Sequence, residues 1–275
     1  ARRYVAGETL ADASARTSKL NEVGFVATLA LLGEEVADRA RAQRAVGEYV
    51  ELIDRIRADG LRSGISIKLT LLGLKIDEQF CRDNLFEVAA AARTAGLFVR
   101  IDMEDHTCTD ATLRLYHGAQ GRYGNLGLVL QAYLRRTLSD IASLEPGTSV
   151  RLCKGIYIEP AQVAYRDFDQ VRESFVACLE ALLARRCHVG VATHDDRLVD
   201  RSRVIVGALG LDEKSYEFQT LLGVREELRD RLHAEGHRVR VYVPYGADWY
   251  LYSIRRLREN PKIAVYVLRA LLGLR

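Results

Sequence analysis

Short apolar runs alternate with helical patterns along most of the chain. A polar helical pattern over residues 8–21 precedes the first run, which extends from Gly24 to Leu32, and a helix follows to about Asp59. Seven further runs, each followed by a helical segment, occupy residues 65–69, 97–102, 126–131, 149–153, 188–192, 216–219 and 239–243. Eight apolar strands at a spacing of roughly 30 residues are typical of parallel βα units that close into a barrel.

We therefore predict an α/β fold, a (βα)8 TIM-like barrel. Residues 1–23 are expected to form an N-terminal helical segment, and residues 24–275 the barrel catalytic domain. A doubly wound open sheet is the rival, but it usually has an early Gly-rich phosphate turn, and the sequence contains no G-x-G-x-x-G or Walker pattern. After the last strand a final helix is expected from near Asp248 to before Pro261, over the barrel mouth.

Composition narrows the classes of partner. The chain has 275 residues of which 48% are hydrophobic, enough for the core of one domain. The 40 basic and 37 acidic side chains are mixed in sign, which argues against nucleic acid as a partner. The five cysteines show neither metal-binding spacing nor a disulfide framework, so we expect no metal and a reducing, cytoplasmic location. No apolar run is long enough to span a bilayer.

Polar residues occupy the predicted carboxyl end of every strand. Barrel enzymes carry their chemistry at this end, because the loops there converge over the packed interior. A purely structural barrel would not need hydrogen-bonding groups at all eight ends, so the sequence predicts a functional cleft. The residues are Glu34, Lys68, Asp102, Gln131, Arg151 with Lys154, Thr193 with His194, Glu217 with Gln219, and Tyr242 with Tyr245.

Taken singly, these residues leave several chemistries open. Lys68 lies between apolar neighbours, which fits either a Schiff-base nucleophile or a buried salt bridge with Asp102. His194 fits a metal ligand, a base or a hydrogen-bonded core histidine, and the lack of a second ligand at metal spacing disfavours the metal. Arg151 and Lys154 are expected to face the mouth, to neutralise the acidic run after Asp102, and to bind an anionic ligand.

The expected final helix carries four functional side chains at helical spacing. Tyr252, Arg255, Arg256 and Glu259 recur at three- and four-residue intervals, so they lie along one side of a helix. Two adjacent arginines can hold one carboxylate, since each offers a planar fork of donors that keeps its charge. The alternative is a solvated basic face with Tyr252 half buried.

Several short motifs follow one another in order from Gly24 onward. They are Leu32-Gly33-Glu34, Ser66-Ile67-Lys68-Leu69, Arg100-Ile101-Asp102-Met103-Glu104, Leu130-Gln131-Ala132-Tyr133, Arg151-Leu152-Cys153-Lys154-Gly155-Ile156-Tyr157, Ala192-Thr193-His194-Asp195, Glu217-Phe218-Gln219-Thr220-Leu221-Leu222-Gly223, Tyr242-Val243-Pro244-Tyr245-Gly246 and residues 252–260. With this set in order, the sequence resembles the proline dehydrogenase family of flavin-dependent (βα)8 barrels. The resemblance implies oxidation of L-proline to 1-pyrroline-5-carboxylate by hydride transfer to FAD, the first step of proline catabolism to glutamate, in a short, single-function bacterial type.

The resemblance also implies roles for individual residues. Lys68, Arg255 and Arg256 would hold the proline carboxylate, and Asp102 would be catalytic and orient one of these arginines. Arg151 would be catalytic near the reactive flavin nitrogen. The pocket walls would be Tyr157, Leu221, Tyr242 and Tyr252, the gate carboxylate would be Glu34, and further FAD contacts would come from Met103, Gln131, Lys154, Gly155, Ile156, Thr193, His194, Gln219 and Glu259.

A quinone or another electron acceptor is implied as a partner, with peripheral contact to the inner membrane. One departure concerns the segment 165–170, which lacks the Lys-containing FAD-contact pattern of the long bifunctional relatives, so contacts to the adenosine half stay open. Two other functions compete with this one. The first is a Schiff-base lyase or aldolase that uses Lys68 or Lys154, and the second is a binding protein or scaffold with arginine-bearing faces.

Overall fold

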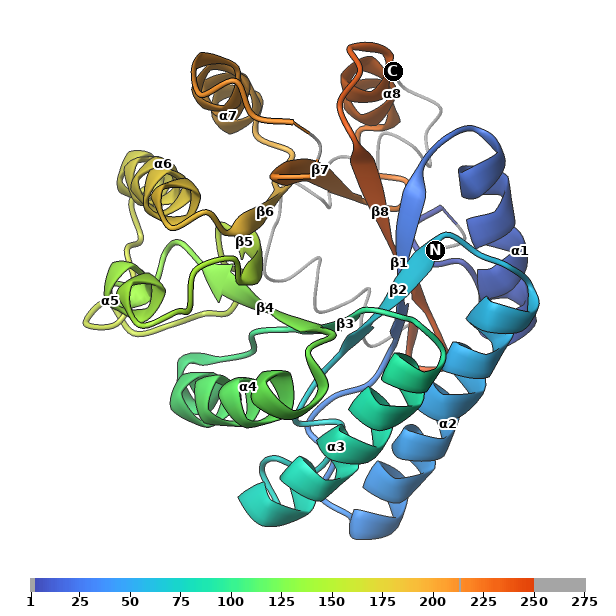
Figure 1. The fold of residues 1–275 in the computed structure, drawn as a ribbon. Coiled ribbons are helices and arrows are strands. Elements are labelled where there is room, and N and C mark those ends of the chain that lie inside the picture. The colour runs from blue at the N-terminus through green and yellow to red at the C-terminus, as the bar shows by residue number, and fades with distance from the viewer. Residues whose placement is uncertain (1–2, 213, 250–275) are drawn as a thin grey trace, which may run out of the picture.

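The computed structural model describes residues 3–212 and 214–249 of the chain. Its centre is a closed barrel of eight parallel strands in sequence order, in which β8 pairs with β1 (Figure 1). The predicted (βα)8 barrel is therefore confirmed. The strands are β1 (Val26–Leu31), β2 (Ser63–Ile67), β3 (Val99–Ile101), β4 (Leu126–Gln131), β5 (Ser149–Cys153), β6 (His188–Ala192), β7 (Tyr216–Leu221) and β8 (Val239–Tyr245).

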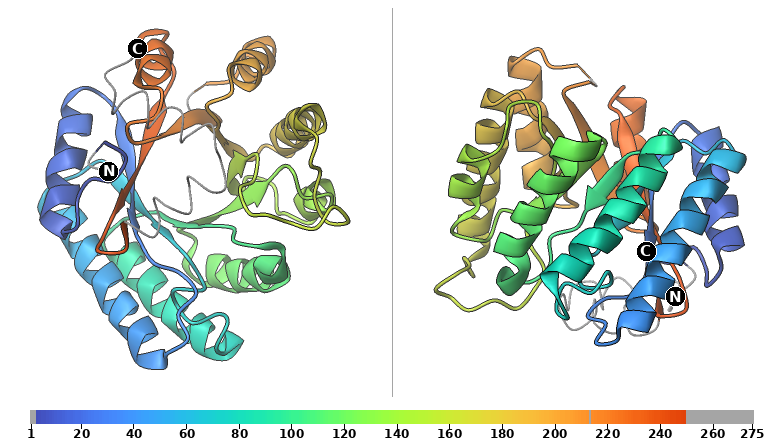
Figure 2. Two further views of the ribbon diagram at one scale, coloured as in Figure 1. Left: turned by 180° about the vertical axis from the view of Figure 1, so that it is seen from behind. Right: turned by 60° about the horizontal axis from the view of Figure 1, so that its bottom comes forward.

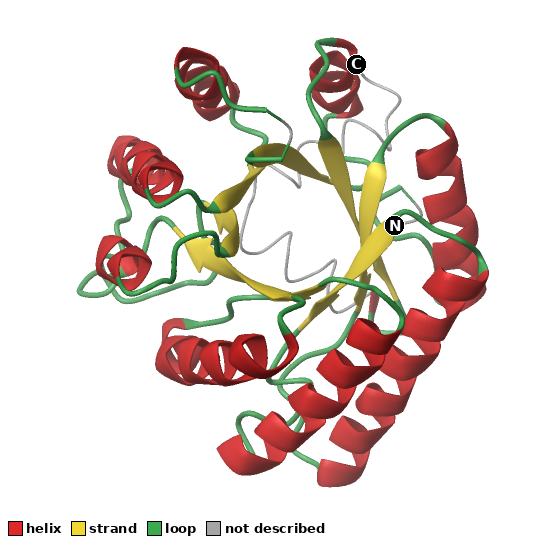
Figure 3. Ribbon diagram, viewed as in Figure 1, coloured by secondary structure: helices red, strands yellow, loops and turns green. Residues whose placement is uncertain are grey.

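Helices surround the strands and form the outer layer, as Figure 3 and the two further views in Figure 2 show. The helix before the first strand packs against β1 and β8. Most of the helix expected between Asp248 and Pro261 falls outside the described residues, so its place over the mouth stays a prediction. The helices are α1 (Leu10–Glu22), α2 (Arg39–Ala58), α3 (Glu78–Thr94), the 3-10 turn η1 (His106–Cys108), α4 (Thr109–Tyr123), α5 (Thr137–Ala142), α6 (Phe168–Ala184), α7 (Asp196–Ala208) and α8 (Glu226–Ala234).

Aspartates fix the points where several outer helices begin. The side chains of Asp38, Asp77, Asp167 and Asp195 accept hydrogen bonds from backbone N–H groups in the first turns of α2, α3, α6 and α7. These N–H groups have no partner inside the helix, so a carboxylate at the cap stabilises each start by about 1 kcal/mol. The caps therefore set how far each loop extends above its strand.

The barrel wall has an apolar outer side and a polar axis. Alternate strand residues point to opposite sides of a sheet, and those that face the helices, such as Leu29, Ile65 and Leu128, are fully buried in the main core. Along the axis, hydrogen bonds cross between strands that are not neighbours, from Arg151 on β5 to Gln219 on β7 and to Asp102 after β3. Because branched aliphatic residues usually fill this axis, its polar character distinguishes the barrel.

Two glycines make room for the polar side chains on the axis. A Cβ atom on Gly127 of β4 would lie 2.5 Å from Arg100 Nη1 and 2.5 Å from the carbonyl oxygen of Ser149. A Cβ atom on Gly190 of β6 would lie 2.3 Å from Gln219 Nε2. Both positions require the absence of a side chain, since real Cβ contacts are not this short.

We predict that Gly127→Ala destabilises the barrel by about 1–3 kcal/mol, because one of its clashes is with backbone that cannot rotate away. Gly121→Ala is the matched control: it lies in α4, a Cβ atom there meets nothing within 4 Å, and it should stabilise by about 0.5–1 kcal/mol. Free energies of unfolding in urea measure both. Equal stability of the two variants would show that Arg100 and Ser149 yield at no cost.

Candidate active site

Asp102, directly after β3, is the centre of the polar groups near the carboxyl ends of the strands. Its Oδ1 atom accepts hydrogen bonds from Arg151 Nη1 at 2.8 Å and Ser66 Oγ at 2.7 Å. Its Oδ2 atom accepts from the Tyr242 hydroxyl at 3.1 Å and lies 3.9 Å from Lys68 Nζ. The salt bridge between Lys68 and Asp102 that the sequence allowed is therefore present. Two nearly buried cations share one carboxylate, which leaves one positive charge in excess.

Arg151 has one donor that the surrounding residues do not use. Its Nε atom donates to Gln219 Oε1 at 2.6 Å, and its guanidinium lies 5.1 Å from the centroid of the Tyr242 ring. Gln219 Nε2 in turn donates to Glu217 Oε1 at 2.6 Å, so both ends of this amide are engaged. In the described part of the chain the buried Arg151 Nη2 atom has no hydrogen-bond partner. A buried donor without an acceptor costs about 1–3 kcal/mol, which a bound acceptor would recover.

The loop after β3 is fixed by Glu104, which is buried. Glu104 accepts hydrogen bonds from the backbone N–H and the hydroxyl of Thr70, and Gln131 Nε2 donates to the Glu104 carbonyl oxygen at 2.9 Å. Burial raises the pKa of the Glu104 carboxyl, although Thr70 and Lys68 act in the opposite direction. Met103 beside it is also buried. This loop therefore joins the ends of β2, β3 and β4 into one rigid rim.

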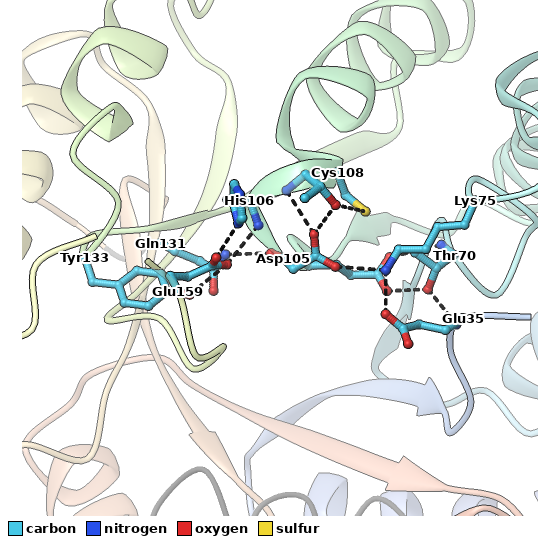
Figure 4. A network of polar contacts seen from close by, with 11 residues as sticks. Glu35, Thr70, Lys75, Asp105, His106, Cys108, Gln131, Tyr133 and Glu159 are labelled. Atoms are coloured by element: carbon cyan, nitrogen blue, oxygen red, sulfur yellow. Dashed lines mark hydrogen bonds and ion pairs between the residues drawn. The ribbon is translucent and has the colours of Figure 1, made fainter. Parts of the chain in front are cut away.

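A second set of contacts, absent from the sequence-based prediction, extends this rim outward (Figure 4). Lys75 Nζ lies between Glu35 Oε1 at 2.5 Å and Asp105 Oδ2 at 3.0 Å, which connects the loops after β1, β2 and β3. The buried Glu159 accepts from the His106 backbone N–H at 2.8 Å and also contacts the His106 ring. All three pairs join loops far apart in sequence, so the local sequence pattern gave no signal for them.

Lys154 and His194 lie beside each other at the ends of β5 and β6, but with partners other than those expected. Lys154 Nζ lies 3.2 Å from Asp195 Oδ2, so the prediction that Lys154 neutralises the acidic run after Asp102 is wrong. His194 Nε2 accepts a hydrogen bond from the backbone N–H of Leu221 at 3.1 Å. Burial, assisted by Arg225 and Lys154, lowers the pKa of His194 to about 4. His194 is thus a neutral, hydrogen-bonded histidine, the third of the options open from sequence.

Two residues assigned to the mouth lie elsewhere. Glu217 is the second residue of β7 and binds Arg240 and Arg238 at the amino end of the barrel, so its placement among the carboxyl ends is wrong. Tyr245 is buried, and burial together with Glu48 and Glu51 of α2 raises its pKa, so it faces α2 and not the mouth. In both cases the strand extends beyond its predicted limits, which shifts the depth or side of the residue.

Some of the remaining predicted site residues lie near the mouth, and the others lie in the part of the chain that the structure does not describe. Gly155 has φ +115°, and a Cβ atom there would lie 2.2 Å from the Tyr133 ring, so packing of this ring already demands glycine. The remaining predicted residues of the described part are half-buried (Glu34, Ile156, Tyr157, Leu221) or buried (Thr193). Tyr252, Arg255, Arg256 and Glu259 lie outside the described residues, as does any pairing of Glu34 with a helix arginine. The described residues include no group of three potential metal ligands.

A closed (βα)8 barrel with charged groups gathered near the carboxyl ends of its strands is the architecture of a barrel enzyme. The family model for proline dehydrogenase matches residues 13–267. Proline dehydrogenase of Deinococcus radiodurans is 38% identical, over 99% of this chain and 90% of the relative. Proline dehydrogenase 1 of Bacillus subtilis is 36% identical, over the same shares. The chain therefore belongs to the proline dehydrogenase family.

Solved structures support the same fold. Proline utilization A (PutA) from Bdellovibrio bacteriovorus, inactivated by N-propargylglycine, matches with a TM-score of 0.87 at 24% identity. PutA from Corynebacterium freiburgense matches with a TM-score of 0.81 at 21% identity. The match covers 93% of this chain but only 32% of the first PutA chain, so this chain spans about a third of that protein.

The environment of His194 predicts a pH dependence of stability. Its pKa is about 4 in the folded protein against an ordinary 6.5, so the unfolded chain binds the extra proton between these values. The stabilisation is complete above pH 6.5 and declines as the pH falls toward 4. His194→Gln keeps an acceptor for the Leu221 N–H, and should reduce the acid-induced loss of unfolding free energy by about 1–3 kcal/mol between about pH 7 and pH 4.5.

Urea denaturation at a series of pH values measures this difference. The control is His117→Gln, a substitution at an exposed position of α4, which should leave the pH profile unchanged. Parallel profiles for wild type and His194→Gln would contradict the assignment of a neutral ring.

Proposed function

We propose that the carboxyl end of this barrel oxidises L-proline to 1-pyrroline-5-carboxylate with FAD as the hydride acceptor. Membership of the proline dehydrogenase family makes the chain an oxidoreductase that acts on proline, in the first step of proline catabolism. The observation that carries the location of the site is the Asp102 cluster, in which buried Lys68 and Arg151 share one carboxylate.

The excess positive charge of this cluster suits a substrate with a carboxylate. Lys68 would contribute to holding the proline carboxylate, together with Arg255 and Arg256 of the undescribed part. Asp102 would keep Lys68 and Arg151 in place, since one of its oxygen atoms lies by Lys68, after β2, and the other by Arg151, on β5. Tyr242, with its hydroxyl anchored on Asp102, would present its ring to the pyrrolidine. Tyr157, Leu221 and Tyr252 would complete the walls and exclude water, and Glu34 would close the pocket.

The described residues fit a bound flavin at this site. Arg151 Nη2 is a buried cationic donor without a partner there, and such a donor favours a group that gains negative charge on reduction. When bound, FAD supplies the acceptor for the hydride from proline. Gln219 holds Arg151 through Nε, so we propose that it also positions this guanidinium. The residues proposed to contact the cofactor are Met103, Gln131, Arg151, Lys154, Gly155, Ile156, Thr193, His194, Gln219 and Glu259.

An electron acceptor must complete the cycle, and we propose a quinone or a molecule of similar chemistry. The protein would work in the cytoplasm and reach the acceptor through peripheral contact with the inner membrane. In residues 3–212 and 214–249, no helix has both the length and the apolarity to cross a bilayer.

The competing functions lack support. A Schiff-base lysine must be free to lose its proton, whereas Lys68 and Lys154 both lie against carboxylates, Asp102 and Asp195. Membership of an oxidoreductase family also argues against a scaffold without turnover.

Anaerobic titration of the purified protein with L-proline tests cofactor, substrate and reaction together. We expect a yellow, FAD-loaded protein whose visible absorption bleaches on addition of proline, because the flavin is reduced. L-Alanine, which has the carboxylate but no ring, should leave the colour unchanged. A preparation that stays colourless after FAD is supplied would refute the flavin proposal.

Asp102→Asn tests the centre of the cluster. The substitution keeps the shape and removes the charge between Lys68 and Arg151, so kcat/KM for proline should fall about 100-fold, which corresponds to roughly 2.7 kcal/mol. Stopped-flow reduction of the flavin measures this. The matched control is Asp105→Asn, three residues along the chain and paired with Lys75, which should change kcat/KM by less than about threefold. Similar losses in both variants would place the effect in the loop and not in Asp102.

A further inference from the structure

A second polar cavity lies at the amino end of the barrel, opposite the end that carries the proposed reaction. Its volume is about 290 Å³. The lining residues come from the first three positions of strands or from just before them: Ser149 and His188 begin β5 and β6, and Arg238 precedes β8. None of them belongs to the site proposed for proline and FAD, apart from the indirect link of Glu217 to Gln219. The lining residues are Thr28, Phe98, Arg100, Ser149, His188, Glu217, Arg238 and Arg240.

The cavity carries an excess of positive charge. Glu217 is its single carboxylate and receives Arg240 Nε at 2.5 Å and Nη2 at 3.0 Å, with Arg238 Nε at 3.3 Å. Burial acts to raise the pKa of Glu217, but Arg240 and the other cations outweigh it and lower the pKa to about 2. Glu217 is therefore ionised. Three guanidiniums against one carboxylate leave two positive charges in the cavity.

Arg100 is the least compensated of these cations. It is 4% exposed, and its Nη1 atom donates to the carbonyl oxygens of Leu128 at 3.1 Å and Ser149 at 2.7 Å. Its Nη2 atom donates to Ser149 Oγ at 2.9 Å and retains a second N–H. In the described part of the chain Arg100 forms no ion pair with a carboxylate. Burial, with the nearby Arg151 and Arg240, lowers the pKa of Arg100 to about 9.

His188 adds a polar atom without a partner. Its Nδ1 atom is buried and, among the described residues, makes no hydrogen bond. Burial and the surrounding Arg100, Arg240 and Arg238 lower the pKa of His188, while Glu217 opposes them, so the ring is neutral. A neutral imidazole carries one N–H, which can be placed on either nitrogen. The ring can thus offer a donor to a group in the cavity.

We propose that this cavity binds a small oxyanion with two negative charges, of the class of inorganic phosphate or a short dicarboxylate. Such a ligand would match the two excess positive charges and would accept hydrogen bonds from Arg100, Arg238 and His188. Arg100 is a buried cation, which is costly unless an anion or acceptor compensates it, and Glu217 pairs with Arg240 and Arg238 instead. Arg238 has a side chain that is 40% exposed, so the ligand would enter beside it.

Calorimetry and thermal unfolding of the flavin-loaded full chain test the proposal, with inorganic phosphate or succinate added and ionic strength held constant with NaCl. We expect saturable binding, and a Tm rise of about 2–6 °C at tenfold the Kd. A response to phosphate alone identifies the ligand as a phosphate, and a response to succinate alone identifies it as a dicarboxylate. A non-saturating response equal to that of NaCl would overturn the proposal and leave the arginines as a structural network.

Two variants locate the binding. Arg238→Gln, at a half-exposed position, should weaken binding at least tenfold. Arg203→Gln is the matched control, since its side chain is 37% exposed and pairs with Glu235 and Asp200 outside the cavity, and it should bind as wild type does.

Ligand should also raise the pKa of His188 in an NMR titration of the ring. Unchanged binding in Arg238→Gln, or an unchanged His188 titration, would refute this site even if proline reduces the flavin normally.

Discussion

The shared carboxylate of Asp102 is the interaction on which the polar axis depends. It holds a lysine after β2 and an arginine on β5, and it anchors the hydroxyl of Tyr242 on β8. Buried cations of this kind are tolerated only when an anion and hydrogen bonds compensate them. The same carboxylate therefore joins side chains from β5, β8 and the loop after β2, at the place where a carboxylate substrate is proposed to bind.

The strand order and the polar strand ends were predictable because each depends only on residues close together in the sequence. Apolar runs give the strands, and the residue after a run falls at the carboxyl end, as Lys68 and Asp102 do. The depth of a residue along the barrel axis is harder to predict from the sequence. Glu217 follows the start of a strand that continues for four further residues, and alternation reveals only its side of the sheet. A strand end misplaced by two residues changes the expected depth of a side chain by about 7 Å.

Contacts between residues far apart in the sequence could not be predicted from local patterns either. Lys154 contacts Asp195, 41 residues later, and His106 contacts Glu159, 53 residues later. These pairs depend on how the loops after different strands meet at the carboxyl end of the barrel, which periodicity does not encode. The flavin came from resemblance and not from pattern, since a ring of polar strand ends indicates a ligand site without specifying its ligand. The pairing of Lys68 with Asp102 was within reach, because neighbouring strands bring their ends together.

The charged axis limits which amino-acid substitutions this sequence can accept during evolution. On the outer side of the barrel wall, aliphatic side chains such as Ile65 and Leu128 can be replaced one at a time by others of similar volume, at a small cost in stability. On the axis, loss of Arg240 would remove the nearest cation from the buried Glu217, and loss of Asp102 would leave two buried cations without their carboxylate. Substitutions there are tolerated mainly as concerted pairs, so the axis should change in steps while the surrounding shell changes gradually.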